Sequence, residues 1–229
     1  RGPERKTVRE DCKPKRTAMP VQLRFATNLT SEQYVSQEAW RRASLDRCPL
    51  HPAGGCGFKR HGSYGRSEPP GARVARWYCR TGRTTCSLLP DCLAAKLPGT
   101  LAELEQVVGA VEQAASVEAA ADRLRPDIEW PGRQRWVRRR RWLLHTALVA
   151  LIALVPEVFG RCEPTLSSLA SSLGTETGAV LSTLRAVAQP QLQQLPPPLG
   201  FGARAAQRVA AGVFRRQHDS GPRAPPAGW

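Results

Sequence analysis

Helical spacing of apolar residues is the main pattern of the chain after residue 100. Thr100 and Glu103 form the Ser/Thr-x-x-Glu pattern of a capping box, and an apolar-periodic segment follows over 101–115. This pattern predicts a helix that begins next to Thr100. The same spacing predicts further helices over 116–124, 133–155, 165–173 and 178–188.

The helix expected over 133–155 is hydrophobic on all sides from Trp142 to Val155. This apolar run is fourteen residues long, which is shorter than the roughly twenty residues that a bilayer requires. A helix that is apolar all round lies either in a protein core or in lipid. We therefore expect a buried helix, and a protein held at a membrane through residues 142–155 is the alternative.

The segment 165–188 has the spacing of a helix-turn-helix motif. Ala170 and Gly174 stand four residues apart and Val180 follows six residues later, at the positions of a small contact residue, a turn glycine and a core residue. For contacts in a DNA groove, the second helix offers Arg185 and mainly neutral side chains. A plain helical hairpin fits this pattern equally well.

The pattern before residue 100 is different. Residues 31–45 predict a short leading helix, whereas cysteine, glycine and proline replace helix formers over 46–92. Within that stretch, residues 73–79 alternate basic with small or apolar side chains, as a half-exposed strand does. Residues 1–30 are expected to form a disordered basic tail. At the other end, the proline-rich residues 189–200 predict a turn or linker.

Composition adds a strong positive charge. The 229 residues include 34 Lys and Arg against 19 Asp and Glu, which gives a net charge of +15. Such a charge favours polyanionic partners such as nucleic acid, and the length excludes a large multi-domain enzyme. Two basic patches are predicted to contact phosphates: Lys59, Arg60, Arg66, Arg73, Arg76, Arg80 and Arg83, and then Arg133, Arg135, Arg138, Arg139, Arg140 and Arg141.

Aromatic residues are interleaved with the first basic patch. Tyr64, Trp77 and Tyr78 stand between its arginines. Aromatic side chains in such a place either stack on nucleic-acid bases or fill a small core. We favour the core for all three.

Cysteine and histidine are grouped near the start of the β-rich stretch. Cys48 and His51 form a Cys-x2-His pair, which places two metal ligands on one tight turn. We predict a zinc site held by this pair together with Cys56 and Cys79. A second pair would be completed three residues after Cys79, but Gly82 stands there. His61 and Cys86 are therefore alternatives to Cys56 as the fourth ligand.

No recognised catalytic pattern occurs in the sequence. It contains no phosphate-binding glycine loop, His-Glu-x-x-His helix or dinucleotide-binding turn in helical context, and nothing marks one cysteine as the nucleophile of a Cys–His pair. We therefore predict that the protein is not an enzyme and has no small-molecule substrate. The N-terminal residues lack the apolar segment of a secretory signal, so we expect a cytoplasmic protein. The start site, Arg1 or Met19, stays open.

Two stretches of sequence carry a family resemblance. CPLHPAGGCGFKRHGSYGR and ARWYCRTGRTTCSLLP resemble the CPxC turn, the basic His-Gly segment and the RYxCxxC strand of zinc-ribbon modules in small bacterial proteins found with transposons and integrases. The resemblance covers about residues 46–92. It implies zinc, DNA binding and following helix-turn-helix elements, with Cys48, His51 and Cys79 at ligand positions. Gly82 departs from the family pattern, and an autonomous transposase is not implied.

Together these features predict an α+β fold, mostly α, with a small N-terminal β zinc ribbon followed by a helical, helix-turn-helix-like domain. The predicted function is zinc-stabilised DNA binding by an accessory or regulatory factor of a mobile genetic element, with a transposase or integrase as a partner. The alternative is a zinc-stapled protein-interaction module without specific DNA binding. The expected divisions are a tail (1–30), a leading helix with the zinc module (31–97), a helical domain (98–190), and a proline-rich linker with a basic C-terminal helix and tail (191–229).

Overall fold

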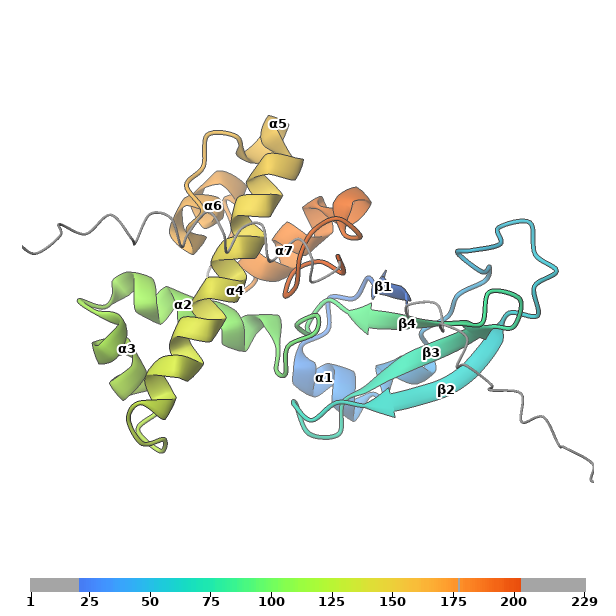
Figure 1. The fold of residues 1–229 in the computed structure, drawn as a ribbon, viewed down its shortest axis with the longest axis horizontal. Helices are drawn as coiled ribbons and strands as arrows, with labels where there is room; N and C mark the ends of the chain where they lie inside the picture. Colours follow the sequence, from blue (N-terminus) through green and yellow to red (C-terminus); the bar gives the residue numbers. More distant parts are fainter. Residues whose placement is uncertain (1–20, 177, 203–229) are drawn as a thin grey trace, which may run out of the picture.

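The computed structural model describes residues 21–176 and 178–202 and has a mixed α/β fold built on a four-stranded sheet (Figure 1). The sheet has the spatial order β1-β4-β3-β2. Its antiparallel part is formed by β2, β3 and β4, and β1 runs parallel to β4. The strands are β1 (Val21–Phe25), β2 (Lys59–Gly65), β3 (Arg73–Cys79) and β4 (Thr84–Pro90). The strand predicted over 73–79 is confirmed as β3.

The predicted fold class, a mostly α protein with a small N-terminal β ribbon, is wrong. Strands β2 to β4 lie in the middle of the chain, and β1 joins their sheet from within the predicted disordered tail. β1 pairs with β4 from Val21 opposite Cys86 to Phe25 opposite Pro90. β1 reads VQLRF and alternates apolar with polar residues as a strand does, but the prediction included this short signal in the basic tail. Its parallel partner follows only after two other strands, so no hairpin spacing points to the pairing. Residues 1–20 of the predicted tail lie outside the described residues.

The two faces of the sheet pack against different elements. On one face, α1 (Ser31–Ser36) and the 3-10 helix η1 (Ala39–Arg41) bury Tyr34 and Trp40 against β3 and β4. Toward the other face, Val74 and Leu89 belong to the main core, which the later helices complete. The single helix predicted over 31–45 is therefore replaced by two shorter elements.

The helical half follows the predicted order closely. Thr100 and Glu103 form the expected capping box, in which each side chain accepts a hydrogen bond of 2.9 Å from the backbone amide of the other residue. The helices predicted over 101–115, 116–124, 133–155, 165–173 and 178–188 are all present with small shifts of their ends. They are α2 (Leu101–Gln113), α3 (Val117–Leu124), α4 (Gly132–Leu154), α6 (Leu166–Leu173) and α7 (Val180–Val187), with the short α5 (Pro156–Phe159) and 3-10 helix η2 (Gln189–Gln191) between or after them.

α4 is the central helix of this half. Its apolar segment is buried in the main core through Leu144, Ala147, Leu148 and Leu151. The expectation of a buried helix is confirmed. Among the helices that the structure describes, none has both the length and the apolar character needed to cross a membrane.

Two glutamates of α2 accept hydrogen bonds from backbone amides at the starts of α6 and α7. The Glu112 carboxylate accepts hydrogen bonds from the backbone amides of Leu166 (2.8 Å) and Ser167 (3.2 Å) at the start of α6. The Glu105 carboxylate accepts from the amide of Leu181 in the first turn of α7 at 3.1 Å. A carboxylate at a helix N-terminus satisfies amides that have no partner inside the helix. Both α6 and α7 are therefore attached to α2.

The end of the described chain packs into the core instead of forming the predicted linker. Leu192, Leu195, Leu199 and Phe201 are all buried in the main core. The prolines between them misled the prediction, because proline disfavours regular elements but does not prevent apolar neighbours from being buried. The basic helix predicted at the C-terminal end, over 203–217, lies outside the described residues.

Arg185 of α7 connects the sheet with this C-terminal segment. Its side chain has an exposed fraction of 0% and donates hydrogen bonds to the backbone carbonyls of Pro90, Asp91, Leu93, Pro198 and Leu199. The prediction that Arg185 is available for contacts in a DNA groove is therefore wrong. The residue instead neutralises the carbonyl dipoles that meet at the end of β4.

Candidate metal centre

The cysteine and histidine cluster lies at the end of the sheet that is far from helices α2 to α7 (Figure 1). Cys48 and His51 face each other across a tight turn, in which the His51 amide donates to the Cys48 carbonyl at 3.1 Å. Gly54 and Gly55 follow with φ of 84° and 74°, a left-handed conformation that glycine adopts without strain. This reversal brings the chain back so that Cys56 lies inside the loop.

Cys79 reaches the cluster as the last residue of β3. The turn after it is tied to the loop, because the backbone amide and the hydroxyl of Thr81 both donate to the Cys56 carbonyl at 3.3 Å. The sheet therefore fixes one side of the cluster, and the loop 46–58 supplies the other.

The four side chains point their ligand atoms at one point. One such atom each from Cys48, His51, Cys56 and Cys79 all lie within 4.8 Å of one another, so the group can hold a metal ion. His51 Nδ1 lies 3.6 Å from Cys48 Sγ and 3.4 Å from Cys79 Sγ. The three cysteines are buried and unbridged. The predicted ligand set is thus brought together as a whole.

The other two candidates for the fourth ligand are not part of this group. His61 is exposed on β2, where its ring lies beside that of Tyr78. Cys86 is buried on β4 and packs in the cluster around Trp77. Burial raises the pKa of the Cys86 thiol to about 11, which keeps it protonated at neutral pH.

The thiols of the cluster influence one another. Burial opposes ionisation of Cys48, but hydrogen bonds from His51 and from the backbone of Leu50 outweigh it and lower the pKa of Cys48 to about 7. Burial raises the pKa of Cys56, and so does its hydrogen bonding to Cys48 and Cys79. A cation at the centre would favour the thiolate form of all three cysteines, because metal ions bind the deprotonated sulfur.

Gly82 contributes to the cluster although it carries no ligand. Its backbone amide donates a hydrogen bond to Cys79 Sγ at 3.2 Å. A Cβ at this position would lie only 3.2 Å from Leu50 Cδ1 and 3.3 Å from Cys79 Sγ. Gly82 therefore leaves room for the cluster and supports one of its sulfur atoms.

Most residues of the first basic patch make contacts within the protein. Arg60 donates to the carbonyls of Trp40, Arg41 and Ala43, Arg66 to those of Ala94 and Leu97, and Arg73 to Ser63. Arg76 lies over the ring of Tyr64. Lys59, Arg80 and Arg83 are exposed near the cysteine and histidine cluster, and the structure pairs none of them with a described carboxylate.

The second basic patch also contains residues with partners inside the protein and residues without a described carboxylate partner. Arg133 pairs with Asp122 at 2.9 Å, Arg138 pairs with Glu118 at 2.6 Å, and the Arg140 guanidinium lies 3.7 Å from the centre of the Trp136 ring. The remaining arginines of α4 are exposed and pair with no described carboxylate: Arg135, Arg139 and Arg141.

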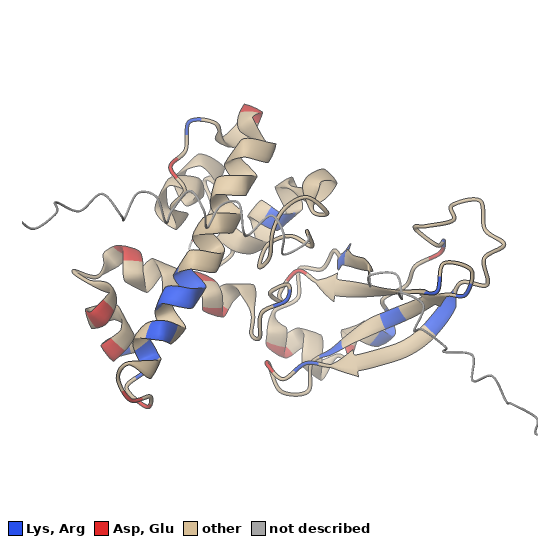
Figure 2. Cartoon of the chain, in the orientation of Figure 1, with Lys and Arg blue, Asp and Glu red and all other residues tan. Residues whose placement is uncertain are grey.

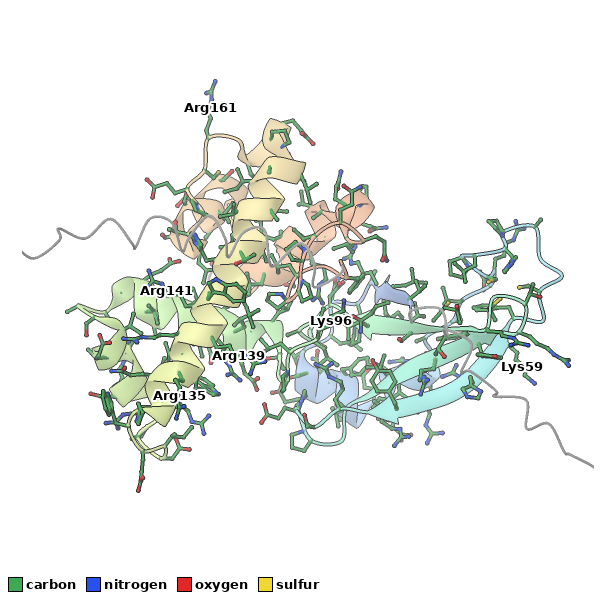
Figure 3. All side chains as sticks on the ribbon, viewed as in Figure 1. Lys59, Lys96, Arg135, Arg139, Arg141 and Arg161 are labelled. Carbon is green, nitrogen blue, oxygen red and sulfur yellow. The ribbon has the colours of Figure 1, made fainter. Side chains whose placement is uncertain are left out.

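These unpaired cations lie in two separate regions. Figure 2 shows one group of basic residues at the sheet end that carries the cluster and another along α4. Figure 3 shows Lys59 in the first region and Arg135, Arg139 and Arg141 in the second. Arg135 and Arg139 are four residues apart, so they project from neighbouring turns on one side of the helix.

Comparison of this chain with protein-family models, with curated proteins and with solved structures found no match.

Proposed function

We propose that the cluster binds zinc and that the metal stabilises a protein that binds duplex DNA through its exposed cations. Zinc bonds of about 2.3 Å to sulfur and about 2.0 Å to nitrogen place tetrahedral ligand atoms about 3.5 to 3.8 Å apart. The two distances from His51 Nδ1 to sulfur, 3.4 and 3.6 Å, lie close to the lower end of this range. Three thiolates and one imidazole form a closed structural site, without an open position for a reactant.

The DNA-binding part of the proposal rests on one observation. Lys59, Arg80 and Arg83 at the metal end, and three arginines of α4, are exposed and pair with no carboxylate of the described chain. Unpaired surface cations bind phosphates with the release of counterions, which makes the affinity salt-dependent. A role at mobile-element DNA, beside a transposase or integrase, follows from the family resemblance alone.

Alanine at Arg135, Arg139 and Arg141 together should weaken duplex binding for all sequences alike. Each lost phosphate contact should reduce the slope of log K against log salt by about 1, because fewer counterions are released. The measurement is fluorescence anisotropy with a duplex between about 50 and 200 mM salt.

A matched control is the double variant Arg133→Ala and Arg138→Ala, which removes cations that already pair with Asp122 and Glu118. It should change the slope by less than the triple variant does. Duplex affinity that is indifferent to salt would contradict the proposal. In that case a zinc-stapled protein-interaction module becomes the better account.

Alanine at Gly82 should weaken zinc binding about tenfold, because the new methyl group must displace Leu50 or Cys79 Sγ. Competition with a chromophoric chelator measures this affinity. Gly109→Ala is the control, because a Cβ there would meet nothing within 4 Å. If both variants bind zinc as the parent protein does, Gly82 has no influence on the cluster.

A further inference from the structure

The face of the sheet opposite α1 carries aromatic and basic side chains near the metal end. Partnered residues of antiparallel strands, and alternate residues of one strand, share a face. The pairs Lys59–Tyr78 and Tyr64–Val74, with Arg76 between Val74 and Tyr78 on β3, therefore place these side chains together. In Figure 1, α1 lies behind the strands and the helices from α2 onward lie beyond one end of the sheet.

The side chains of this face are accessible at the metal end. Lys59 is exposed, whereas Arg76 and Tyr78 are half-buried. Their neighbours on the other face, Trp77 and Cys79, have exposed fractions of 4% and 0%. At this end of β3, Trp77 and Cys79 are buried, whereas Arg76 and Tyr78 keep contact with solvent. The expectation that Tyr78 fills the core is therefore not met, and Val74 on the same face is buried in the main core at the other end of the strand.

A β-bulge brings a further ring to this face. The register of β2 and β3 shifts between Arg60 and Ser63, and Gly62 within the shift has φ of 84°. The His61 ring then lies 5.8 Å from the Tyr78 ring, measured between centroids. Bulges of this kind redirect side chains and are common beside functional sites.

We infer that His61, Tyr78 and Arg76 form a platform on which unpaired bases of single-stranded nucleic acid stack, with Lys59 at its edge for phosphate contact. Two neighbouring rings, and the side of the Arg76 guanidinium that does not face Tyr64, present π surfaces that any base can cover. This combination of stacking and basic residues is typical of single-strand binding sheets. A paired base inside a duplex is already stacked on both sides, so it cannot use these surfaces. The platform thus adds single-stranded nucleic acid to the ligands of the proposed function. It does not depend on the duplex contacts of α4.

The test compares two single strands of equal charge. One is a fluorescent oligothymidine of about 12 nucleotides, and the other is an abasic oligonucleotide of the same length, which keeps the phosphates and lacks the bases. The complete protein should bind the thymidine strand about tenfold more tightly. An oligouridine of the same length, measured beside them, identifies RNA or DNA as the source of the bases by the tighter binding.

Tyr78→Ala and His61→Ala should each remove most of this preference and leave the affinity for the abasic strand unchanged. Tyr78→Phe keeps the ring and should keep the preference. Trp130→Ala is the control, because it removes an aromatic side chain that is 64% exposed outside the sheet. Since His61 is exposed, its variant tests the platform even if Tyr78→Ala disturbs the fold.

Equal affinity of the parent protein for the thymidine and abasic strands overturns the platform. If salt-dependent duplex binding persists in that case, the proposed function stands without it. A preference for bases that survives both alanine variants also overturns the assignment. If neither strand nor the duplex binds, the platform and the proposed function both fail.

Discussion

Methionine at Arg185 lowers the free energy of unfolding by about 4 kcal/mol, the typical cost of leaving several buried polar groups without partners. Methionine is apolar and of similar length, so it fills much of the space but offers no donor. Five backbone carbonyls that now accept hydrogen bonds from Arg185 would lose them. For a chain of this size the midpoint of thermal unfolding should fall by about 8 to 16 °C.

The matched control is Arg139→Met, which makes the same change at an exposed position of α4. Exposed substitutions usually alter the free energy of unfolding by less than about 0.5 kcal/mol. Arg185→Lys keeps a charge and three donors but lacks the planar guanidinium group. Its free energy of unfolding should lie between those of the parent protein and Arg185→Met. Equal midpoints for Arg185→Met and Arg139→Met would show that Arg185 does not connect the sheet with the helical half.

The substitution Cys79→Ser should change hydrogen exchange most strongly in the loop 46–58. The buried apolar cluster at this end of the sheet contains only Cys48, Cys56 and Cys79, with the half-buried Phe58 beside them. We expect that so few apolar contacts do not order the loop alone and that binding of the proposed metal supplies the rest. Without the metal, backbone amides of the loop should exchange with deuterium at least about 100-fold faster.

The helical core should remain protected in the same experiment, because its buried residues form a separate cluster. Treatment of the parent protein with a strong chelator should reproduce the pattern of Cys79→Ser. Cys162→Ser is the control, because Cys162 is only half-buried and belongs to the helical half. Unchanged exchange in the loop after complete chelation would mean that the loop is ordered without a metal.

The sequence predicted the helical half well because its signals are local. The capping box at Thr100 and the continuous apolar run of α4 are read from neighbouring residues, and both appear in the structure as expected. The fold class failed for the opposite reason. The parallel pairing of β1 with β4 and the burial of 192–201 depend on partners far away in the chain, which no local pattern encodes.

The metal cluster was predictable, but the role of individual cations was not. Spacing and turn residues around Cys48 and His51 indicate a ligand pair whatever the rest of the fold does. By contrast, Arg60, Arg135 and Arg185 look alike in the sequence. The structure places the first on backbone carbonyls, the second at the surface and the third in the core. A basic pattern therefore indicates the sign of a surface but does not identify its available residues.

The account depends most on the metal at the end of the sheet, and elemental analysis of purified protein by mass spectrometry tests it directly. We expect about one zinc ion per chain in the parent protein and in Cys162→Ser, and none in Cys48→Ser or Cys79→Ser. Parent protein that carries no metal after purification and takes up none from excess zinc would contradict the account. So would zinc retained at the full level by both serine variants of the cluster.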